Sequence, residues 1–269
     1  MKRKFNVACF QTNSSDTPIE NIEMLEKMFK VLNRKPVDLV CLPECVSIFT
    51  DSKLKLNEYF TKWHKEFMHF IIMSAKKYNT KILIGSFPYR KRNKKFLNRS
   101  MLIDKNGEIM CKYDKINLFD VSLNKKENYF ESENYDPGKK KGLVKLPWGN
   151  LGLSICYDIR FPSLFKELAK KGADFFSIPA AFTYTTGRNH WHTLIKARAI
   201  ENGCFVFAAA QCGYHKNGRR TFGHSLIVDP WGNIIAEAKE KISVIFASVE
   251  IDLISEFRKR IPSMTDYNF

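Results

Sequence analysis

Two residues of the sequence lie where an apolar strand is predicted to end, and the first of them is Cys156. It closes the run LGLSIC, just before a tight turn (Tyr-Asp-Ile-Arg) and a helix that begins near Pro162. A thiol there would project into the crevice at the carboxyl end of the strand, near the positive pole of the helix, which favours a thiolate. The alternative is that Cys156 is a small core residue, the ordinary role of a buried free cysteine.

The second residue is Glu44, which directly follows the apolar strand DLVCLP. If the strands before Glu44 and Cys156 run parallel, both side chains meet at the same edge of a sheet. A carboxylate in a desolvated cleft has a raised pKa and can act as a general base. The alternative for Glu44 is a helix-capping or loop role.

The six histidines offer a competing scheme, in which one of them would activate Cys156. His190 and His192 lie two apart on a predicted helix, so they face different sides and make a poor metal pair. His224 begins a predicted strand, where it could be a structural histidine. The cysteines and histidines show no metal-ligand spacing, and no glycine-rich nucleotide loop is present, so we expect neither metal nor cofactor.

Predicted strands and helices alternate along the chain, which favours stacked α/β layers with mixed sheets and a single large domain. The segment 114–141 is polar and predicted to be irregular, and a loop of that length is usually functional or disordered. Strands are predicted at Phe5–Phe10, Asp38–Leu42, Ile82–Phe87, Arg99–Asp104, Glu108–Tyr113, Gly152–Cys156, Ala173–Pro179, Cys204–Gln211 and Ser243–Ile251, with a hairpin turn at Asp229–Asn233. Helices are predicted at Ile19–Leu32 (capped within Ser14–Asp16), Tyr59–Tyr78, Pro162–Gly172 and Arg188–Glu201.

The chain is basic, with 44 Lys+Arg against 28 Asp+Glu and a net charge of +16. Such an excess could serve nucleic acid, an acidic membrane surface or anionic substrates. The basic runs Lys91–Lys95 and Lys139–Lys141 are short, so we expect solvated basic faces and no nucleic-acid partner. Seven cysteines without a Cys-x-x-Cys pair indicate a reducing cytoplasm, and no apolar run approaches the length of an export signal or a membrane span.

An ordered set of segments resembles the nitrilase (carbon–nitrogen hydrolase) superfamily from about Phe5 to Pro262. The segments are LPE at 42–44, YDKINLFDV at 113–121, GLSICYDIRFP at 152–162, HWHTLIKARAIEN at 190–202 and GHSLIVDPWG at 223–232. The resemblance implies one domain over residues 1–269, folded as a four-layer α-β-β-α sandwich and assembled into homodimers or larger homo-oligomers. Within the superfamily, AAAQCGYH at 208–215 and RKRIP at 258–262 look closest to the branch that hydrolyses deaminated glutathione.

The resemblance also implies a Glu–Lys–Cys triad of Glu44, Lys115 and Cys156. Glu44 would be the general base, Cys156 the nucleophile that forms a thioester, and Lys115 would hold the oxyanion together with the backbone N–H of Tyr157. Nothing in the local sequence distinguishes Lys115 from the many other lysines.

Further site residues follow from the same resemblance. A second glutamate matches Glu131 in FESENYDPG, with Glu133 as the alternative. Phe182 and Thr183, together with the 114–141 segment, would border the substrate pocket. Arg188 would either reach a ligand carboxylate or lie exposed at a helix start.

Two departures from the family pattern concern the substrate more than the chemistry. Asn117 stands where His is frequent, and His192 where close relatives often carry Glu. The implied activity is hydrolysis of a small carboxamide to carboxylate and ammonia. The alternatives are an ω-amidase acting on α-keto-acid amides, an N-carbamoyl amide hydrolase, a scaffold without turnover, and a nucleic-acid binder.

Overall fold

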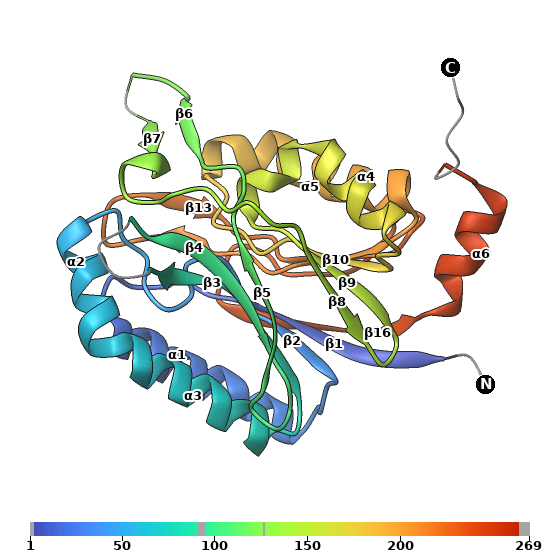
Figure 1. Ribbon diagram of the computed structural model, residues 1–269, viewed down its shortest axis with the longest axis horizontal. Helices are drawn as coiled ribbons and strands as arrows, with labels where there is room; N and C mark the ends of the chain where they lie inside the picture. Colours follow the sequence, from blue (N-terminus) through green and yellow to red (C-terminus); the bar gives the residue numbers. More distant parts are fainter. Residues whose placement is uncertain (1–2, 91–94, 126, 264–269) are drawn as a thin grey trace.

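The computed structural model describes residues 3–90, 95–125 and 127–263 (Figure 1). Of the basic run Lys91–Lys95, residues 91–94 therefore lie outside the described residues.

The fold is built on two six-stranded sheets. The first has the order β16 (Ser243–Glu250), β1 (Lys4–Gln11), β2 (Leu39–Cys41), β3 (Lys81–Tyr89), β4 (Leu97–Ile103), β5 (Ile109–Asp114). The second has the order β15 (Ile234–Glu237), β14 (Leu226–Val228), β11 (Phe205–Ala208), β10 (Phe175–Ser177), β9 (Gly149–Leu153), β8 (Gly142–Leu146).

Both sheets are mixed, as the sequence predicts. The central strands β1, β2 and β3 are parallel to one another, and so are β9, β10 and β11. The outer strands of each sheet pair antiparallel. Parallel strands need crossover helices, and these helices cover the outer faces of the sheets.

Helices cover the two outer faces, so the molecule has four layers. In Figure 1, α1 (Pro18–Phe29) and α3 (His64–Lys77) lie against the first sheet, while α4 (Pro162–Lys170) and α5 (Tyr184–Asn202) lie against the second. The two sheets pack on each other in the middle. This confirms the α-β-β-α sandwich that the family resemblance implies.

The strand β1 shows how the sequence specifies two cores at once. Phe5, Val7 and Cys9 belong to the apolar cluster between the sheets, whereas Ala8 and Phe10 belong to the cluster under α1 and α3. Successive side chains of a strand point to opposite faces, so a strand buried on both faces must be apolar throughout. The run FNVACF meets that requirement at all but one position.

Several boundaries differ from the sequence-based prediction. The first helix begins at Pro18 after Thr17, which makes no side-chain cap, instead of being capped within Ser14–Asp16. Proline is pre-organised for a first helical turn and needs no cap for its missing N–H. The second predicted helix begins earlier, as α2 (Lys53–Glu58), capped by Ser52, and reaches α3 through a short π-helix at Tyr59–Trp63.

Some elements were not predicted. The 114–141 segment contains a small hairpin of β6 (Asp120–Ser122) and β7 (Asn128–Phe130). A second hairpin consists of β12 (Cys212–Tyr214) and β13 (Arg220–Phe222), and α6 (Asp252–Arg260) follows the last strand. Among the described residues, no helix is both long and apolar enough to cross a membrane.

Gly85 on β3 allows the close approach of the segment that follows β2. A Cβ atom at Gly85 would overlap the backbone of Leu42 and Pro43, immediately before Glu44. We expect Gly85→Ala to lower the free energy of unfolding by about 3 kcal/mol, because backbone cannot move aside as a side-chain end can. Urea unfolding followed by circular dichroism measures this.

Gly152→Ala on β9 is the matched control. Its added Cβ would lie 3.0 Å from the Phe176 side chain, which can adjust. Equal losses of stability in the Gly85 and Gly152 variants would show that the close approach of Leu42 and Pro43 to β3 does not require glycine at position 85.

Candidate active site

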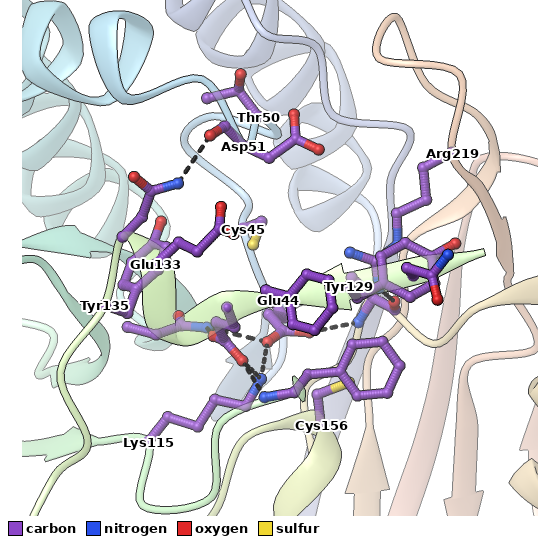
Figure 2. A pocket seen from close by; sticks show the side chains of 17 residues that line it. Glu44, Cys45, Thr50, Asp51, Lys115, Tyr129, Glu133, Tyr135, Cys156 and Arg219 are labelled. Carbon is purple, nitrogen blue, oxygen red and sulfur yellow. Dashed lines mark hydrogen bonds and ion pairs between the residues drawn. The ribbon is translucent and has the colours of Figure 1, made fainter. Parts of the chain in front are cut away.

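The side chains of Glu44, Lys115 and Cys156 point into one cavity from different elements (Figure 2). Glu44 follows β2 and Lys115 follows β5, both in the first sheet, whereas Cys156 follows β9 in the second. The expectation that Glu44 and Cys156 meet at the edge of one sheet is therefore wrong. They meet across the two packed sheets.

Cys156 lies beyond its strand rather than at the end of it. Strand β9 ends at Leu153, and Cys156 opens a short 3-10 helix with φ of 46°, a left-handed conformation that is rare for a residue with a side chain. Its N–H donates to the Pro179 carbonyl at 2.8 Å, and the Ile155 N–H donates to Asp158 at 2.9 Å. Such backbone strain persists only where surrounding contacts enforce it, and it is concentrated at functional sites.

Lys115 lies between two carboxylates and is almost wholly buried, with its side chain 2% exposed. Its Nζ atom donates to Glu44 Oε1 at 2.9 Å and to Glu131 Oε2 at 2.8 Å. Asn98 Nδ2 donates to both glutamates, at 3.0 and 2.9 Å. The second oxygen of Glu44 accepts from the Ala181 N–H at 2.8 Å.

Of the two candidate second glutamates, Glu131 is the one that contacts Lys115. It also accepts from the Phe119 N–H at 2.7 Å, which fixes its carboxylate. Glu133 lines the cavity but its side chain is exposed. Glu131 thus belongs to the hydrogen-bond network of Lys115 and Asn98, whereas Glu133, two residues further along the chain, lies at the margin of the cavity.

The cavity has a volume of about 230 Å³. Residues of the 114–141 segment form much of its wall, as expected for a loop that borders a pocket. A smaller recess adjoins it beside Cys156, lined by Tyr157, Phe182 and Thr183. A space of this size fits a small molecule.

Comparison with known proteins agrees with this architecture. The family model described as carbon-nitrogen hydrolase matches residues 6–259. A protein of Synechocystis sp. named deaminated glutathione amidase is 38% identical over 266 residues, covering 97% of each chain. The chain belongs to the carbon–nitrogen hydrolase family.

Two further relatives widen the comparison. A Xenopus tropicalis protein named Omega-amidase NIT2 is 33% identical over 259 residues, covering 96% of this chain and 93% of that protein. The crystal structure of the Caenorhabditis elegans NitFhit protein superposes with a TM-score of 0.94 at 33% identity. That match covers 99% of this chain and 66% of the NitFhit chain.

In this carbon–nitrogen hydrolase site, the ion pairs of Lys115 with Glu44 and Glu131 keep the buried side chains charged. Burial by itself raises the pKa of Glu44, but the Lys115 ammonium outweighs it and holds that pKa below its usual value. Burial likewise opposes the charge on Lys115, yet Glu131 and Glu44 raise its pKa well above normal. The expectation of a raised pKa for Glu44 is therefore wrong, because a cation lies against the carboxylate.

The thiol also differs from the sequence-based expectation of a favoured thiolate. Burial and the nearby Glu44 carboxylate raise the pKa of Cys156 well above its ordinary value, and the opposing effect of Lys115 is smaller. The resting residue is a neutral thiol. A neutral thiol becomes a nucleophile only when a base removes its proton, and the ionised carboxylate of Glu44 lies beside it.

The predicted substrate contacts separate into two groups. Phe182 and Thr183 line the recess, and Thr183 also caps α5 by accepting from the Thr186 N–H. Arg188 lies exposed on α5, over the Tyr184 ring at 5.8 Å, and lines neither cavity. Of its two expected roles, the exposed helix-start position is the one observed.

Arg219, like Asn98, is one of the cavity residues that sequence reasoning missed. It lines both the cavity and the recess, donates to the Ala181 carbonyl at 2.9 Å, and stacks over the Tyr129 ring at 4.7 Å. Its Nε atom is buried and has no hydrogen-bond partner among the described residues. Nothing in the run HKNGRR separates this arginine from the other basic residues.

Asn117, the first departure from the family pattern, contacts Asp158 in the turn that begins at Cys156. Its N–H and side-chain amide both donate to Asp158 Oδ1, at 2.9 and 2.8 Å. Tyr113 donates to the other oxygen of Asp158 at 2.7 Å. Asp158 therefore joins the segment that carries Lys115 to the turn that carries Cys156.

The lowered pKa of Glu44 makes part of the stability depend on pH. A carboxylate whose folded pKa lies below its ordinary value of 4.5 stabilises the fold above that pH, and the contribution disappears as the pH falls through the lowered pKa. We expect Glu44→Gln to be destabilising at pH 7 and progressively less so below about pH 4.5. Urea unfolding at a series of pH values measures the difference from wild type.

The exposed Glu133 supplies the control for this experiment. Glu133→Gln should change stability little at any pH, because an exposed charge is screened by solvent. A cost for Glu44→Gln that stays constant as the pH falls would contradict the assigned charge on Glu44.

Proposed function

We propose that this protein is a cysteine-dependent amidase that cleaves the amide of an α-keto acid, with deaminated glutathione as its substrate. The observation that carries the proposal is that Cys156, Glu44 and Lys115 line one cavity, where Lys115 Nζ donates to Glu44 at 2.9 Å. A base, a nucleophile and a cation are the groups that acyl transfer through a thioester requires.

In the first half-reaction, Glu44 takes the thiol proton as the Cys156 sulfur attacks the amide carbon. The carbonyl oxygen becomes an oxyanion. An ammonium has three donors, and Lys115 directs two of them at Glu44 and Glu131, which leaves a third for that oxygen. The Tyr157 N–H, in the first turn after the nucleophile, is the second proposed donor.

Collapse of the tetrahedral intermediate breaks the carbon–nitrogen bond and forms the thioester. Glu44 returns its proton to the departing nitrogen. Glu44 then takes a proton from water, whose oxygen attacks the thioester carbon, and the carboxylate product leaves as the thiol is restored. Glu131 keeps Lys115 oriented throughout. The steps use these protein groups and one water molecule.

The choice of substrate rests on the relatives. Of the two relatives described above, the Synechocystis protein named deaminated glutathione amidase is 38% identical to this chain, and the Xenopus tropicalis protein named Omega-amidase NIT2 is 33% identical. In deaminated glutathione the leaving nitrogen is the amino group of cysteinylglycine, and ammonia leaves only when the substrate is a primary amide. The second candidate, an ω-amidase, therefore differs in its leaving group and not in its chemistry.

We further propose that Arg219 binds the carboxylate at the glycine end of that substrate. A guanidinium presents a planar fork of donors that matches a carboxylate. Its unpartnered Nε and its stacking on Tyr129 favour this role over that of Arg188, which is exposed on α5.

We also propose that the protein is cytoplasmic and assembles into a homodimer or a larger homo-oligomer. All seven cysteines are free thiols, which suits a reducing compartment. Apolar side chains are exposed near the helices of the second sheet, among them Ile200 and Trp231. An apolar patch of this kind is typical of a surface that a second copy covers.

Variants of the three central residues test the mechanism. Cys156→Ala should abolish turnover, because no thioester can form. Glu44→Gln and Lys115→Ala should each lower turnover at least about a hundredfold, through loss of the base or of an oxyanion donor. Release of the α-keto acid is the measurement, with thermal unfolding as a check on the fold.

Cys111→Ala, a half-buried thiol on β5 outside the cavity, is the matched control and should keep wild-type turnover. Full activity in Cys156→Ala would overturn the mechanism. Near-normal rates in either of the other two variants, measured at a temperature at which the variant is folded, would remove that residue from the triad.

The substrate is tested by comparing deaminated glutathione with α-ketoglutaramate. Both release the same α-keto acid, so one assay measures both. We expect the higher kcat/KM with deaminated glutathione, because only this substrate has a carboxylate at the far end of its leaving group. A tenfold or greater preference for α-ketoglutaramate would identify an ω-amidase instead.

In the same assay, Arg219→Gln tests whether Arg219 binds the glycine carboxylate of deaminated glutathione. We expect KM for deaminated glutathione to rise about tenfold or more, and KM for α-ketoglutaramate to change less, since one ionic hydrogen bond contributes about 1.5–3 kcal/mol. Equal effects on both substrates would remove Arg219 from recognition of the glycine carboxylate.

A further inference from the structure

A second cluster of chemically active side chains lies outside the cavity. It consists of His192 on α5, His224 in the link between β13 and β14, and Glu237 at the end of β15. Glu237 Oε1 accepts from His192 Nε2 at 2.9 Å and from His224 Nδ1 at 2.8 Å. The three ligand atoms all lie within 4.8 Å of one another.

His224 is held rigidly in this cluster. It adopts a left-handed backbone conformation with φ of 54°, and its N–H donates to the Lys239 carbonyl at 3.1 Å. Its own carbonyl accepts from Trp191 Nε1 at 2.7 Å, and its ring stacks on Phe222 at 4.3 Å. A strained histidine fixed at its backbone and its ring holds its Nδ1 atom in one direction, toward Glu237.

The other two side chains come from regular elements. His192 lies within the helix α5, and Glu237 on a strand of the second sheet. The three side chains are 33%, 20% and 34% exposed for His192, His224 and Glu237. The cluster is thus pre-formed, yet open enough for an ion and a water molecule to reach it.

The donor set matches a particular class of ion. Two imidazole nitrogens and one carboxylate oxygen are ligands that Zn²⁺ and its neighbours among the divalent transition metals bind well. Tetrahedral Zn²⁺ with ligands at about 2.0–2.1 Å places those ligands about 3.3 Å apart. The two nitrogen–oxygen distances need to lengthen by about half an ångström. The two imidazole nitrogens, up to 4.8 Å apart, need to approach each other by up to about 1.5 Å, and rotation of the three side chains can supply both changes.

We propose that His192, His224 and Glu237 form a binding site for one divalent transition-metal ion, with water as the fourth ligand. The two hydrogen bonds to Glu237 hold the ligands together when no ion is bound. A bound ion would fasten α5 to the β13–β14 link and to β15. His192, the second departure from the family pattern, contributes one of the two imidazoles, and the site is independent of the proposed amidase chemistry.

Zinc titration of metal-free protein without a polyhistidine tag tests the site. Isothermal titration calorimetry at pH 7.5 should show one Zn²⁺ per chain with a dissociation constant in the micromolar range or below. Saturating zinc should raise Tm by about 5 °C or more, because the ion binds the folded state. Cobalt at the same site should give the visible absorption of a tetrahedral complex.

Matched variants assign the ligands. His192→Ala and Glu237→Gln should each weaken zinc binding at least tenfold, while His190→Ala, an exposed histidine on the same helix, should bind as wild type does. Glu237→Gln retains the shape of the side chain, so its loss of affinity would not reflect unfolding. Absence of binding in wild type, or equal affinity in all three variants, would overturn the proposal.

Discussion

The ammonium of Lys115 buried between Glu44 and Glu131 is the interaction on which the rest of the site depends. Removing a charge from water costs several kcal/mol, and the cost is offset only where every charge is paired and hydrogen-bonded. Here Asn98 donates to the other oxygen of Glu131 and the Ala181 N–H to the other oxygen of Glu44, while the Phe119 N–H is a second donor to the Glu131 oxygen that faces Lys115. The network therefore ties β5, the segment after β2 and the 114–141 segment to the second sheet through Ala181.

A second junction lies on the other side of the nucleophile. Asp158 accepts hydrogen bonds from Tyr113, from Asn117 and from the Ile155 N–H. The residue before Cys156 and the residues around Lys115 are thus held by one buried carboxylate. That cross-link accounts for the left-handed backbone of Cys156, because contacts on both sides of the turn over-determine it.

The helix α5 connects the candidate active site with the histidine cluster. The Trp191 ring packs on Phe182 of the recess at 5.1 Å, while its Nε1 donates to the His224 carbonyl. His192, the next residue, belongs to the cluster itself. One helix therefore contributes both to the wall of the recess and to the proposed metal site.

The sequence by itself determined that this protein has stacked α/β layers with mixed sheets, and which apolar runs form its central strands. Apolar runs such as FNVACF require burial on both faces, and their alternation with helices leads to stacked α/β layers. Only the tertiary structure decided that Glu44 and Cys156 meet across two sheets and that Arg219, not Arg188, lines the cavity. It also decided that Lys115, which the family resemblance implies, is buried between two glutamates. Local periodicity specifies which face of an element is buried, but a cavity between two sheets depends on contacts far apart in the chain. Charge also follows those contacts, which is why Glu44, expected to have a raised pKa, has a lowered one beside Lys115.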